Sequence, residues 1–225
     1  MIKKLVTGIL LSLIGVCIYS FIVIFQANIY TEDVVLSDYK NGIWRIHEGK
    51  EHPLILKTED MSREQLRWLL KIQDPGFYEH NGIDLFTPGA GLTTITQSIV
   101  KKLYFKEFKP GFKKIKQSLI ARLVVNEMLN KNQQLEIFIN SVYMGNVNGE
   151  EIYGLSQSSQ AYYGKEVFNL SEDEYLSLVA MLIGPNQFSL LENIEMNRER
   201  ADRIRAVISG KYQPKALTDV YYNRT

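Results

Sequence analysis

The hydrophobic positions along the chain fall into two regimes. Residues 5–25 form an apolar run without a charged side chain. From Ser62 onward apolar residues recur every three or four positions, which is the spacing of one helix face. As a helix, the first run is about 30 Å long and matches the hydrocarbon core of a bilayer. The pattern therefore predicts a membrane-spanning helix followed by a mainly α domain.

The flanks of the apolar run predict its orientation. Lys3 and Lys4 precede the run, and the next basic residue is Lys40. Basic residues favour the cytoplasmic side of a membrane. We therefore expect residues 1–4 to be a cytoplasmic tip, and everything after residue 26 to lie on the outer face. A buried core helix is disfavoured, because soluble helices rarely lack a polar face.

Helix signals and breakers divide the rest of the chain. Residues 26–61 are expected to be a connector, extended over residues 29–58 with a short strand at residues 43–46, and residues 211–225 a C-terminal tail. The helical domain, residues 62–210, contains a loop rich in Gly and Pro at residues 74–92. The expected helices are 62–73, 93–104, 112–129, 132–144, 154–163, 171–184 and 195–209.

One of these helices carries an apolar stripe and lies in a strongly basic segment. The stripe, typical of a core-facing surface, consists of Phe112, Ile115, Leu119 and Leu123. Between Lys101 and Arg122 the chain has eight basic residues and one acid, Glu107. Such a run is commonly a solvated helix face, and it can also bind phosphate or anionic lipid. Composition leaves both interpretations open.

Overall composition narrows the function. The chain has 225 residues and a formal net charge of +1, which gives no reason to expect a nucleic-acid partner. Its single cysteine, Cys17, excludes an intramolecular disulfide framework. The three histidines lack a zinc-binding spacing, so we expect no protein-bound metal.

Short motifs follow one another in the helical domain. They span Phe77–Asp84, Gly91–Lys101, Lys113–Gln117, Leu135–Gly145, Ala161–Lys165 and Leu170–Glu174, with a looser match at Arg200–Val207. In this order they resemble the motifs of glycosyltransferase family 51, which begin with EDxxFYxHxGxD, GGSTITQQLxK and RKxxE. These are the peptidoglycan glycosyltransferases, found as monofunctional transglycosylases and as the first domain of class A penicillin-binding proteins. The resemblance covers residues 65–209.

The resemblance implies a lysozyme-like helical glycosyltransferase domain that acts on lipid II at the outer face of a bacterial inner membrane. In that family one glutamate deprotonates the incoming hydroxyl, a second assists at the donor, and basic side chains stabilise the departing pyrophosphate. The implied partners are lipid II, the growing glycan strand and membrane lipids, with other cell-wall synthesis proteins as further candidates. No cofactor is implied on the protein, although a divalent cation could accompany the pyrophosphate.

Matching positions give the candidate site. The positions at the catalytic centre are Gln73, Gln117 and Asp74. The substrate-binding candidates are Phe77, His80, Thr94, Lys101, Lys113 and Lys114. We expect Gln73 and Gln117 to face one shared groove. The aromatic residues Tyr104, Phe105, Phe108 and Phe112 are candidates for a contact with the bilayer, and the same pattern also fits an ordinary core edge flanked by solvated lysines.

Both catalytic glutamate positions hold glutamine in this chain. A glutamine amide cannot take up a proton at neutral pH, and a general base contributes ~10²–10⁴-fold. One explanation is a divergent relative that binds the lipid-linked glycan but polymerises it poorly or not at all. A second is an enzyme that uses another carboxylate, from Asp74, Glu79 and Asp84. A third, an engineered double Glu→Gln variant, is least favoured, because Leu92, Ser98 and Lys113 also depart from the family pattern.

A different class of function stays open beside these. The chain could be a membrane-tethered scaffold that recruits cell-wall enzymes without binding the glycan. We expect a monofunctional layout, without the transpeptidase chemistry that uses a Ser-x-x-Lys nucleophile.

Overall fold

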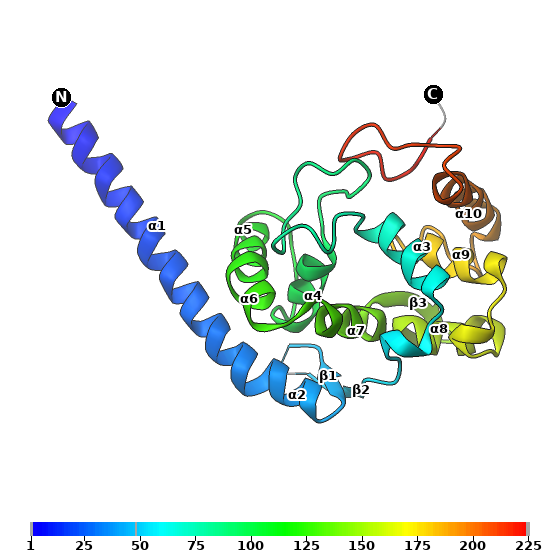
Figure 1. Cartoon of the computed structure of the whole chain (residues 1–225). Helices are drawn as coiled ribbons and strands as arrows, with labels where there is room; N and C mark the ends of the chain where they lie inside the picture. The colour runs from blue at the N-terminus through cyan, green and yellow to red at the C-terminus, as the bar shows by residue number, and fades with distance from the viewer. Residues whose placement is uncertain (1, 48, 224–225) are drawn as a thin grey trace.

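The structure, a computed structural model, describes residues 2–47 and 49–223 and joins a mainly helical domain to a long N-terminal helix (Figure 1). The predicted mainly α fold is confirmed. Residue 1 of the predicted tip, residue 48 of the connector and residues 224–225 of the tail lie outside the described residues. The α-helices are α1 (Ile2–Tyr30), α2 (Ser37–Lys40), α3 (Arg63–Gln73), α4 (Ile95–Leu103), α5 (Phe112–Ile120), α6 (Asn126–Met128), α7 (Lys131–Ser141), α8 (Gly154–Tyr163), α9 (Glu172–Met181) and α10 (Ile194–Ile208). Other helical turns are the π-helical η1 (Thr31–Leu36) and η3 (Ala121–Val125) and the 3₁₀ turns η2 (Thr58–Asp60) and η4 (Val167–Asn169).

The N-terminal helix does not end where the connector was expected to begin. α1 continues through η1 into α2, so the expectation of extended chain is wrong for residues 29–40. The Thr31 hydroxyl donates to the Ala27 carbonyl oxygen (2.6 Å) and lies 2.6 Å from the Tyr104 hydroxyl of the domain. This polar contact is buried between the N-terminal helix and the domain. It holds residues 27–31 against the domain, and the helix continues from α1 into η1.

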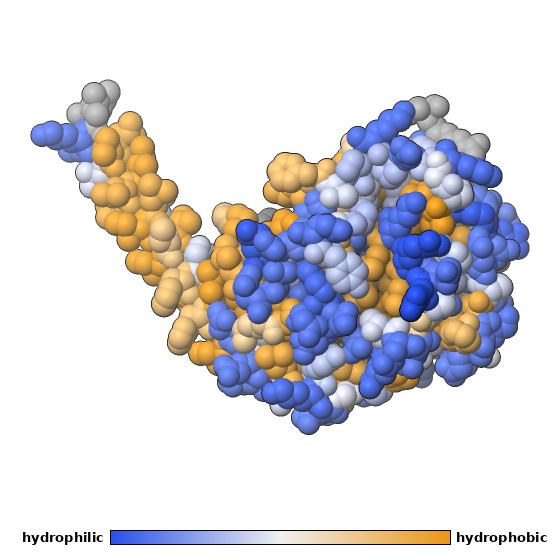
Figure 2. Space-filling model, viewed as in Figure 1, coloured by the Kyte–Doolittle hydropathy of each residue, from blue (hydrophilic) through white to orange (hydrophobic). Residues whose placement is uncertain are grey.

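α1 is long and apolar enough to cross a membrane, judged by length and composition. Most of its apolar side chains are exposed, and Figure 2 shows hydrophobic residues covering the helix and continuing onto the adjoining edge of the domain. The covered side chains lie toward its C-terminal end, where Val23 and Ala27 are 4% exposed and α1 packs against α5. α5 therefore stands beside the end of the predicted span, residues 5–25.

The apolar stripe of α5 and η3 faces away from the core, contrary to the expectation. Phe112 is 88% exposed, and Ile115 and Leu123 are exposed as well. The buried face carries Gln117 and, one and two turns later, residues of the core such as Val124. The stripe lies outward because the helix stands next to α1, so that its apolar side extends the apolar surface of α1.

Two antiparallel hairpins complete the fold. β1 (Ile43–Arg45) pairs with β2 (Glu51–Pro53), which confirms the predicted strand. β3 (Tyr143–Val147) pairs with β4 (Glu150–Tyr153), and this hairpin was not expected. The helix predicted over residues 132–144 therefore ends earlier, at Ser141. Asn148-Gly149, both at positive φ, forms the turn, and this dipeptide is a hairpin signal in the sequence.

The other predicted helices are confirmed to within a few residues. Several starts are fixed by side-chain caps that accept the backbone N–H three residues on, at Ser62, Thr94, Asn130 and Ser171. The core lies between α4, α7 and α9 and includes Ile99, Phe138 and Leu178. Residues 74–92 form an irregular loop, as predicted, and the loop rests on the N-terminal end of α4.

Candidate functional site

The first two positions of the EDxxFYxHxGxD pattern fall on Gln73 and Asp74, ahead of Phe77–Asp84, so the first motif begins where α3 ends. Asp74 is the C-cap of α3 and is fully buried. Its carboxylate accepts hydrogen bonds from the backbone N–H of Ile95 (2.8 Å) and from Nε2 of His80 (2.9 Å). Asp74 thus joins the loop to α4 and has donors on both oxygens. Gln73, just before it, is half-buried, and its side chain has no hydrogen-bond partner in the described part of the chain, so it is free to meet a ligand.

His80 is held inside the loop. The Gly82 backbone N–H donates to Nδ1 of His80 (3.0 Å), so the hydrogen-bond network assigns the proton to Nε2, which donates to Asp74. The His80 carbonyl accepts from Nζ of Lys131 (2.9 Å), and this ammonium lies 4.7 Å from the ring centre of the buried Phe77. Phe77 and His80, expected to bind substrate, therefore contact the loop's own framework.

The other candidate carboxylates differ in their surroundings. Asp84 accepts the backbone N–H groups of Phe86 and Thr87, both at 2.9 Å. Burial opposes ionisation of Asp84, but the hydrogen bonds from Thr87 and Phe86 hold its pKa below the ordinary value. Glu79 is exposed. Both bonds go to Oδ1 of Asp84, and its Oδ2 is buried without a hydrogen-bond partner among the described residues. Because Asp74 and Asp84 are both buried, Glu79 is the accessible carboxylate of the three.

Thr94 links the loop to the start of α4. Its hydroxyl donates to the Gly82 carbonyl (2.8 Å) and accepts the backbone N–H of Gln97 (3.1 Å). The Gln97 side chain completes this capping box and also donates to the Ser118 hydroxyl of α5 (2.9 Å). Thr94 was expected to bind substrate, but its side chain is buried and instead positions the loop against α4.

Gln117 is buried in α5 and makes a hydrogen bond to α4. It is 1% exposed, and its Nε2 donates to the backbone carbonyl of Gln97 at 2.6 Å. Its Oε1 is buried without a hydrogen-bond partner. Gln117 therefore points into the protein, whereas Gln73 is half-exposed. The groove expected to be shared by Gln73 and Gln117 stays a prediction, and in this structure Gln117 does not face open solvent.

The two lysines of the third motif contact the protein itself. Lys113 Nζ donates to the Glu107 carbonyl (2.6 Å). Lys114 Nζ donates to the carbonyl of Leu92 (2.9 Å) and lies 3.1 Å from the Thr93 hydroxyl. Burial lowers the pKa of Lys114. Lys114 thus holds the end of the loop against α5, while Lys113 is exposed.

A basic cavity of about 360 Å³ opens beside α4. Its polar lining includes Ser98, Lys101, Lys102, Lys106 and Tyr143. Its apolar lining includes Phe105, Phe108, Leu182 and Ile183. Neither Gln73 nor Gln117 lines it. α4 connects it to the first motif, because Ser98 and Lys101 lie about 4.5 and 9 Å along the helix axis from Ile95.

Lys102 and Lys106 were not among the expected site residues. Lys102 Nζ lies 4.3 Å from the ring centre of Tyr153. Burial lowers the pKa of Lys102 to about 8, although Glu151 opposes the shift. The run of basic residues from Lys101 to Arg122 could have identified both lysines. Matching to the family motifs selected only Lys101 from the part of the run in and just after α4.

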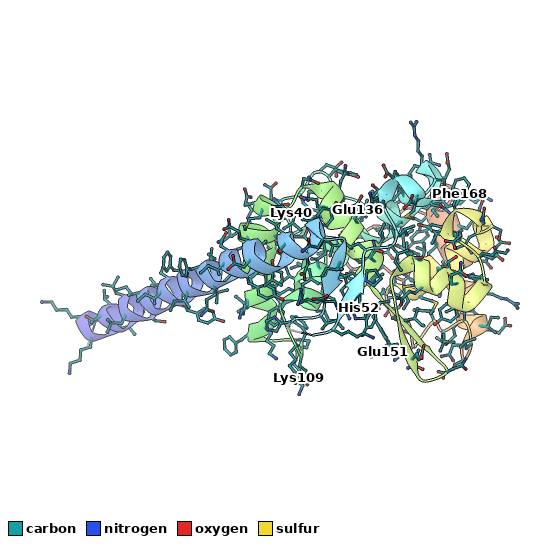
Figure 3. All side chains as sticks on the ribbon, turned by 90° about the horizontal axis from the view of Figure 1, so that it is seen from below. Lys40, His52, Lys109, Glu136, Glu151 and Phe168 are labelled. Atoms are coloured by element: carbon teal, nitrogen blue, oxygen red, sulfur yellow. The ribbon has the colours of Figure 1, made fainter. Side chains whose placement is uncertain are left out.

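The expected membrane-contacting aromatic segment is only partly exposed. Tyr104 and Phe105 are buried, so their assignment to a bilayer contact is wrong, because both complete the core beneath α1. Phe108 is half-buried and its ring meets Phe105 edge to face. Phe112 alone of the four projects fully from the surface. Lys109 of the same segment projects away from the domain (Figure 3).

The spacing of a transpeptidase nucleophile occurs in this chain. Ser-x-x-Lys is found at Ser37–Lys40 and at Ser98–Lys101, so the sequence does not exclude transpeptidase chemistry by lacking this spacing, and the expectation of a monofunctional layout has no support from it. The companion sequences Ser-Asp-Asn and Lys-Thr-Gly are absent from the chain. Ser98 and Lys101 line the cavity but share no hydrogen bond among the described residues. The expected monofunctional layout therefore stays a prediction.

Comparison with known proteins matches this region to a family. The transglycosylase family model matches residues 40–209. The chain is 26% identical over 185 residues to penicillin-binding protein 1A of Vibrio cholerae, covering 76% of this chain and 22% of that protein. It is 30% identical over 149 residues to penicillin-binding protein 1B of Escherichia coli K12, covering 60% of this chain and 18% of that protein.

A similar relative occurs outside these two genera. Penicillin-binding protein 1F of Bacillus subtilis is 29% identical over 155 residues, covering 63% of this chain and 21% of that protein. The chain thus spans about a fifth of the length of these curated relatives. The family match covers most of the chain and includes each of the motifs, which confirms the predicted resemblance. The chain belongs to the transglycosylase family, glycosyltransferase family 51.

Proposed function

We propose that this protein binds a lipid-linked, pyrophosphate-bearing glycan precursor, lipid II, and polymerises it slowly or not at all. The observation that carries the proposal is the basic cavity beside α4, where Lys101, Lys102 and Lys106 meet apolar walls in a transglycosylase domain. The growing glycan strand would be the second ligand of the same domain.

The lining of the cavity fits an amphiphilic anion. Three ammonium groups can each make charge-assisted hydrogen bonds to phosphate oxygens, worth roughly 1.5–3 kcal/mol apiece. The walls at Phe105, Phe108 and Ile183 suit the first isoprenoid units of a lipid carrier. No cofactor on the protein is needed for this binding, and a divalent cation would travel with the pyrophosphate.

The chemistry at the first motif explains why turnover would be slow. Gln73 is accessible but cannot accept a proton, and Gln117 is buried in a hydrogen bond to the backbone. Asp74 has donors on both oxygens, and Asp84 is buried with Oδ1 bonded to the backbone, so neither is exposed to replace the missing base. Glu79 is the remaining carboxylate through which an active enzyme could work.

The apolar surface around α1 supports attachment to the inner membrane of a bacterium. We propose that α1 spans this membrane with its N-terminus in the cytoplasm, which places the cavity on the outer face where lipid II is exposed. The outward stripe of α5, with Phe112 and Ile115, would then lie at the level of the lipid headgroups and acyl chains. The basic side chains that flank it suit anionic lipids.

The test uses the full chain in lipid nanodiscs with labelled lipid II. We expect the unmodified chain to bind lipid II, with little glycan product on a gel. Lys101→Met and Lys106→Met should each weaken binding by about tenfold, since one charge-assisted contact of about 1.5 kcal/mol is lost. Lys57→Met is the matched control, because Lys57 is exposed and does not line the cavity.

The outcomes separate the candidate functions. Binding that the Lys101→Met and Lys106→Met variants weaken supports the proposal. Rapid glycan formation by the unmodified chain would show an active enzyme with a different base. Absence of lipid II binding would leave the scaffold function, in which the domain recruits other cell-wall synthesis proteins.

A further inference from the structure

The C-terminal segment, residues 211–223, folds back over the loop that carries the first motif. It lies beyond the family match, which ends at residue 209. The Gly89 N–H donates to the Ala216 carbonyl (2.9 Å), and the Gly91 N–H donates to the Leu217 carbonyl (2.8 Å). These two hydrogen bonds run backbone to backbone, so the segment and the loop are joined much as two short strands would be.

The two glycines allow this close approach. Gly89 and Gly91 both have positive φ, at +80° and +71°. A Cβ on Gly89 would lie 2.9 Å from the ring of Pro214, and one on Gly91 would lie 3.1 Å from the Val220 side chain. The segment thus occupies the space that side chains would need, and the loop lies directly against it.

Two buried side chains anchor the segment to the core. Tyr222 is 1% exposed, and its hydroxyl donates to the Ile72 carbonyl (3.2 Å). Arg200 of α10 is also buried and donates to the carbonyls of Val220 (3.0 Å) and Ala180 (3.1 Å). Its guanidinium lies 5.6 Å from the ring centre of Tyr222. The segment is therefore fixed at its far end.

The Tyr222 hydrogen bond lies next to Gln73, the half-exposed residue of the first motif. Ile72, which receives the Tyr222 hydroxyl, immediately precedes Gln73. The rest of the loop is tied at Asp74, at Gly82 through Thr94, and at Leu92 through Lys114. The hydrogen bonds from Gly89 and Gly91 to the C-terminal segment hold the part of the loop between Gly82 and Leu92.

We propose that the C-terminal segment, residues 211–223, is a strap that positions the loop at residues 74–92, with Tyr222 as the positioning residue behind Gln73. The strap touches no ligand itself. It holds the loop in one conformation against the start of α4, the helix that carries the cavity residues Ser98 and Lys101, and through α4 it sets the ligand affinity. This inference rests on the proposed function for its effect on lipid II, and on the contacts alone for its effect on the loop.

The test compares Tyr222→Phe with Tyr221→Phe in the full chain in nanodiscs. Both variants lose one hydroxyl from adjacent residues of the strap, but Tyr221 is exposed and makes no hydrogen bond through that group within the described chain. For Tyr222→Phe we expect amide hydrogen exchange in residues 72–91 to accelerate by roughly two- to tenfold, with α7 and α9 unchanged. Lipid II affinity should fall by a similar factor, and Tyr221→Phe should change neither quantity.

A chain ending at Gly210 gives a stronger version of the same test, with a larger local increase in exchange. If that chain fails to fold, Tyr222→Phe decides the question alone. Unchanged exchange in residues 72–91, or an equal increase throughout the core, would overturn the strap. Failure of the unmodified chain to bind lipid II would instead refute the proposed function, while the exchange data would still report on the strap.

Discussion

Replacing Gln117 by the glutamate of the family motif should destabilise this protein. Gln117 Nε2 donates to the Gln97 carbonyl at 2.6 Å in a site that is 1% exposed. A carboxylate at this position would place a second acceptor against that carbonyl. The neighbouring lysines do not compensate, because Lys113 and Lys114 are bonded to the carbonyls of Glu107 and Leu92. The basic cluster therefore does not surround the Gln117 side chain.

The magnitude follows from the groups left unpaired. The Gln97 carbonyl lies within α4, so the cost comes from the lost Gln117 hydrogen bond, about 0.5–1.5 kcal/mol, and from the buried carboxylate without a donor, about 1–3 kcal/mol or more. We expect Gln117→Glu to lower the free energy of unfolding by about 2–4 kcal/mol at pH 7.5. Gln73→Glu is the matched control, since Gln73 is half-exposed with no partner to lose, and its effect should stay within about 0.5 kcal/mol.

The loss should depend on pH with a defined sign. Burial and the facing carbonyl raise the pKa of the introduced carboxyl group above its unfolded value of about 4.3. The folded variant then holds more protons than the unfolded chain between these two pKa values, so its stability falls as the pH rises through that window. Below pH ~4 the protonated group can donate its O–H to the Gln97 carbonyl, and the deficit should be small.

The assay is urea unfolding of the full chain in detergent micelles, followed by the fluorescence of Trp44 and Trp68. Unfolding midpoints at pH 4.0, 5.5 and 7.5 would be compared for the unmodified chain, Gln117→Glu and Gln73→Glu. A Gln117→Glu variant as stable as the unmodified chain at pH 7.5 would refute the reasoning. So would a deficit that shrinks as the pH rises.

Further predictions concern the membrane surface, the cavity and the loop. In nanodiscs, Phe112→Trp should be quenched by brominated lipid, whereas Phe168→Trp, at the end of the domain away from α1 (Figure 3), should not; equal quenching would contradict the membrane surface around α5. Lipid II affinity should fall as the pH rises through about 8, where Lys102 loses its charge, and a Lys102→Met variant that keeps this dependence in binding titrations would contradict the assignment. His80→Asn should lower the free energy of unfolding by about 2–3 kcal/mol in urea, because its bonds to Asp74 and Gly82 are lost; a change below about 0.5 kcal/mol would contradict the network.

The sequence predicted the helices better than it predicted which way they face. The expected helices and the loop at residues 74–92 were confirmed, because helix ends depend on local signals such as the side-chain caps at Ser62 and Ser171. The Phe112 stripe was read as a core face because periodicity reports an apolar side and not what covers it. Beside α1, whose apolar side chains are mostly exposed, that side faces outward, and the polar Gln117 faces inward.

The candidate site was predicted only in part, because a sequence motif does not show which contacts a side chain makes in the folded protein. Motif matching located Asp74, His80 and Lys114, but it could not show that all three are engaged in internal hydrogen bonds. These contacts join residues that are distant in sequence. Lys102 was visible only as one charge in a basic run, since its burial beside Tyr153 depends on a hairpin that the sequence analysis missed.

The most direct test of the central claim is glycan polymerisation by Gln73→Glu, with Gln117 left in place, compared with the unmodified chain at saturating lipid II. The account predicts that both chains bind lipid II alike and that the variant forms product ~10²-fold faster or more, the contribution of one general base. Equal, rapid polymerisation by the two chains would contradict the claim that a missing base at position 73 limits the reaction. Normal binding with no product from Gln73→Glu would contradict it as well.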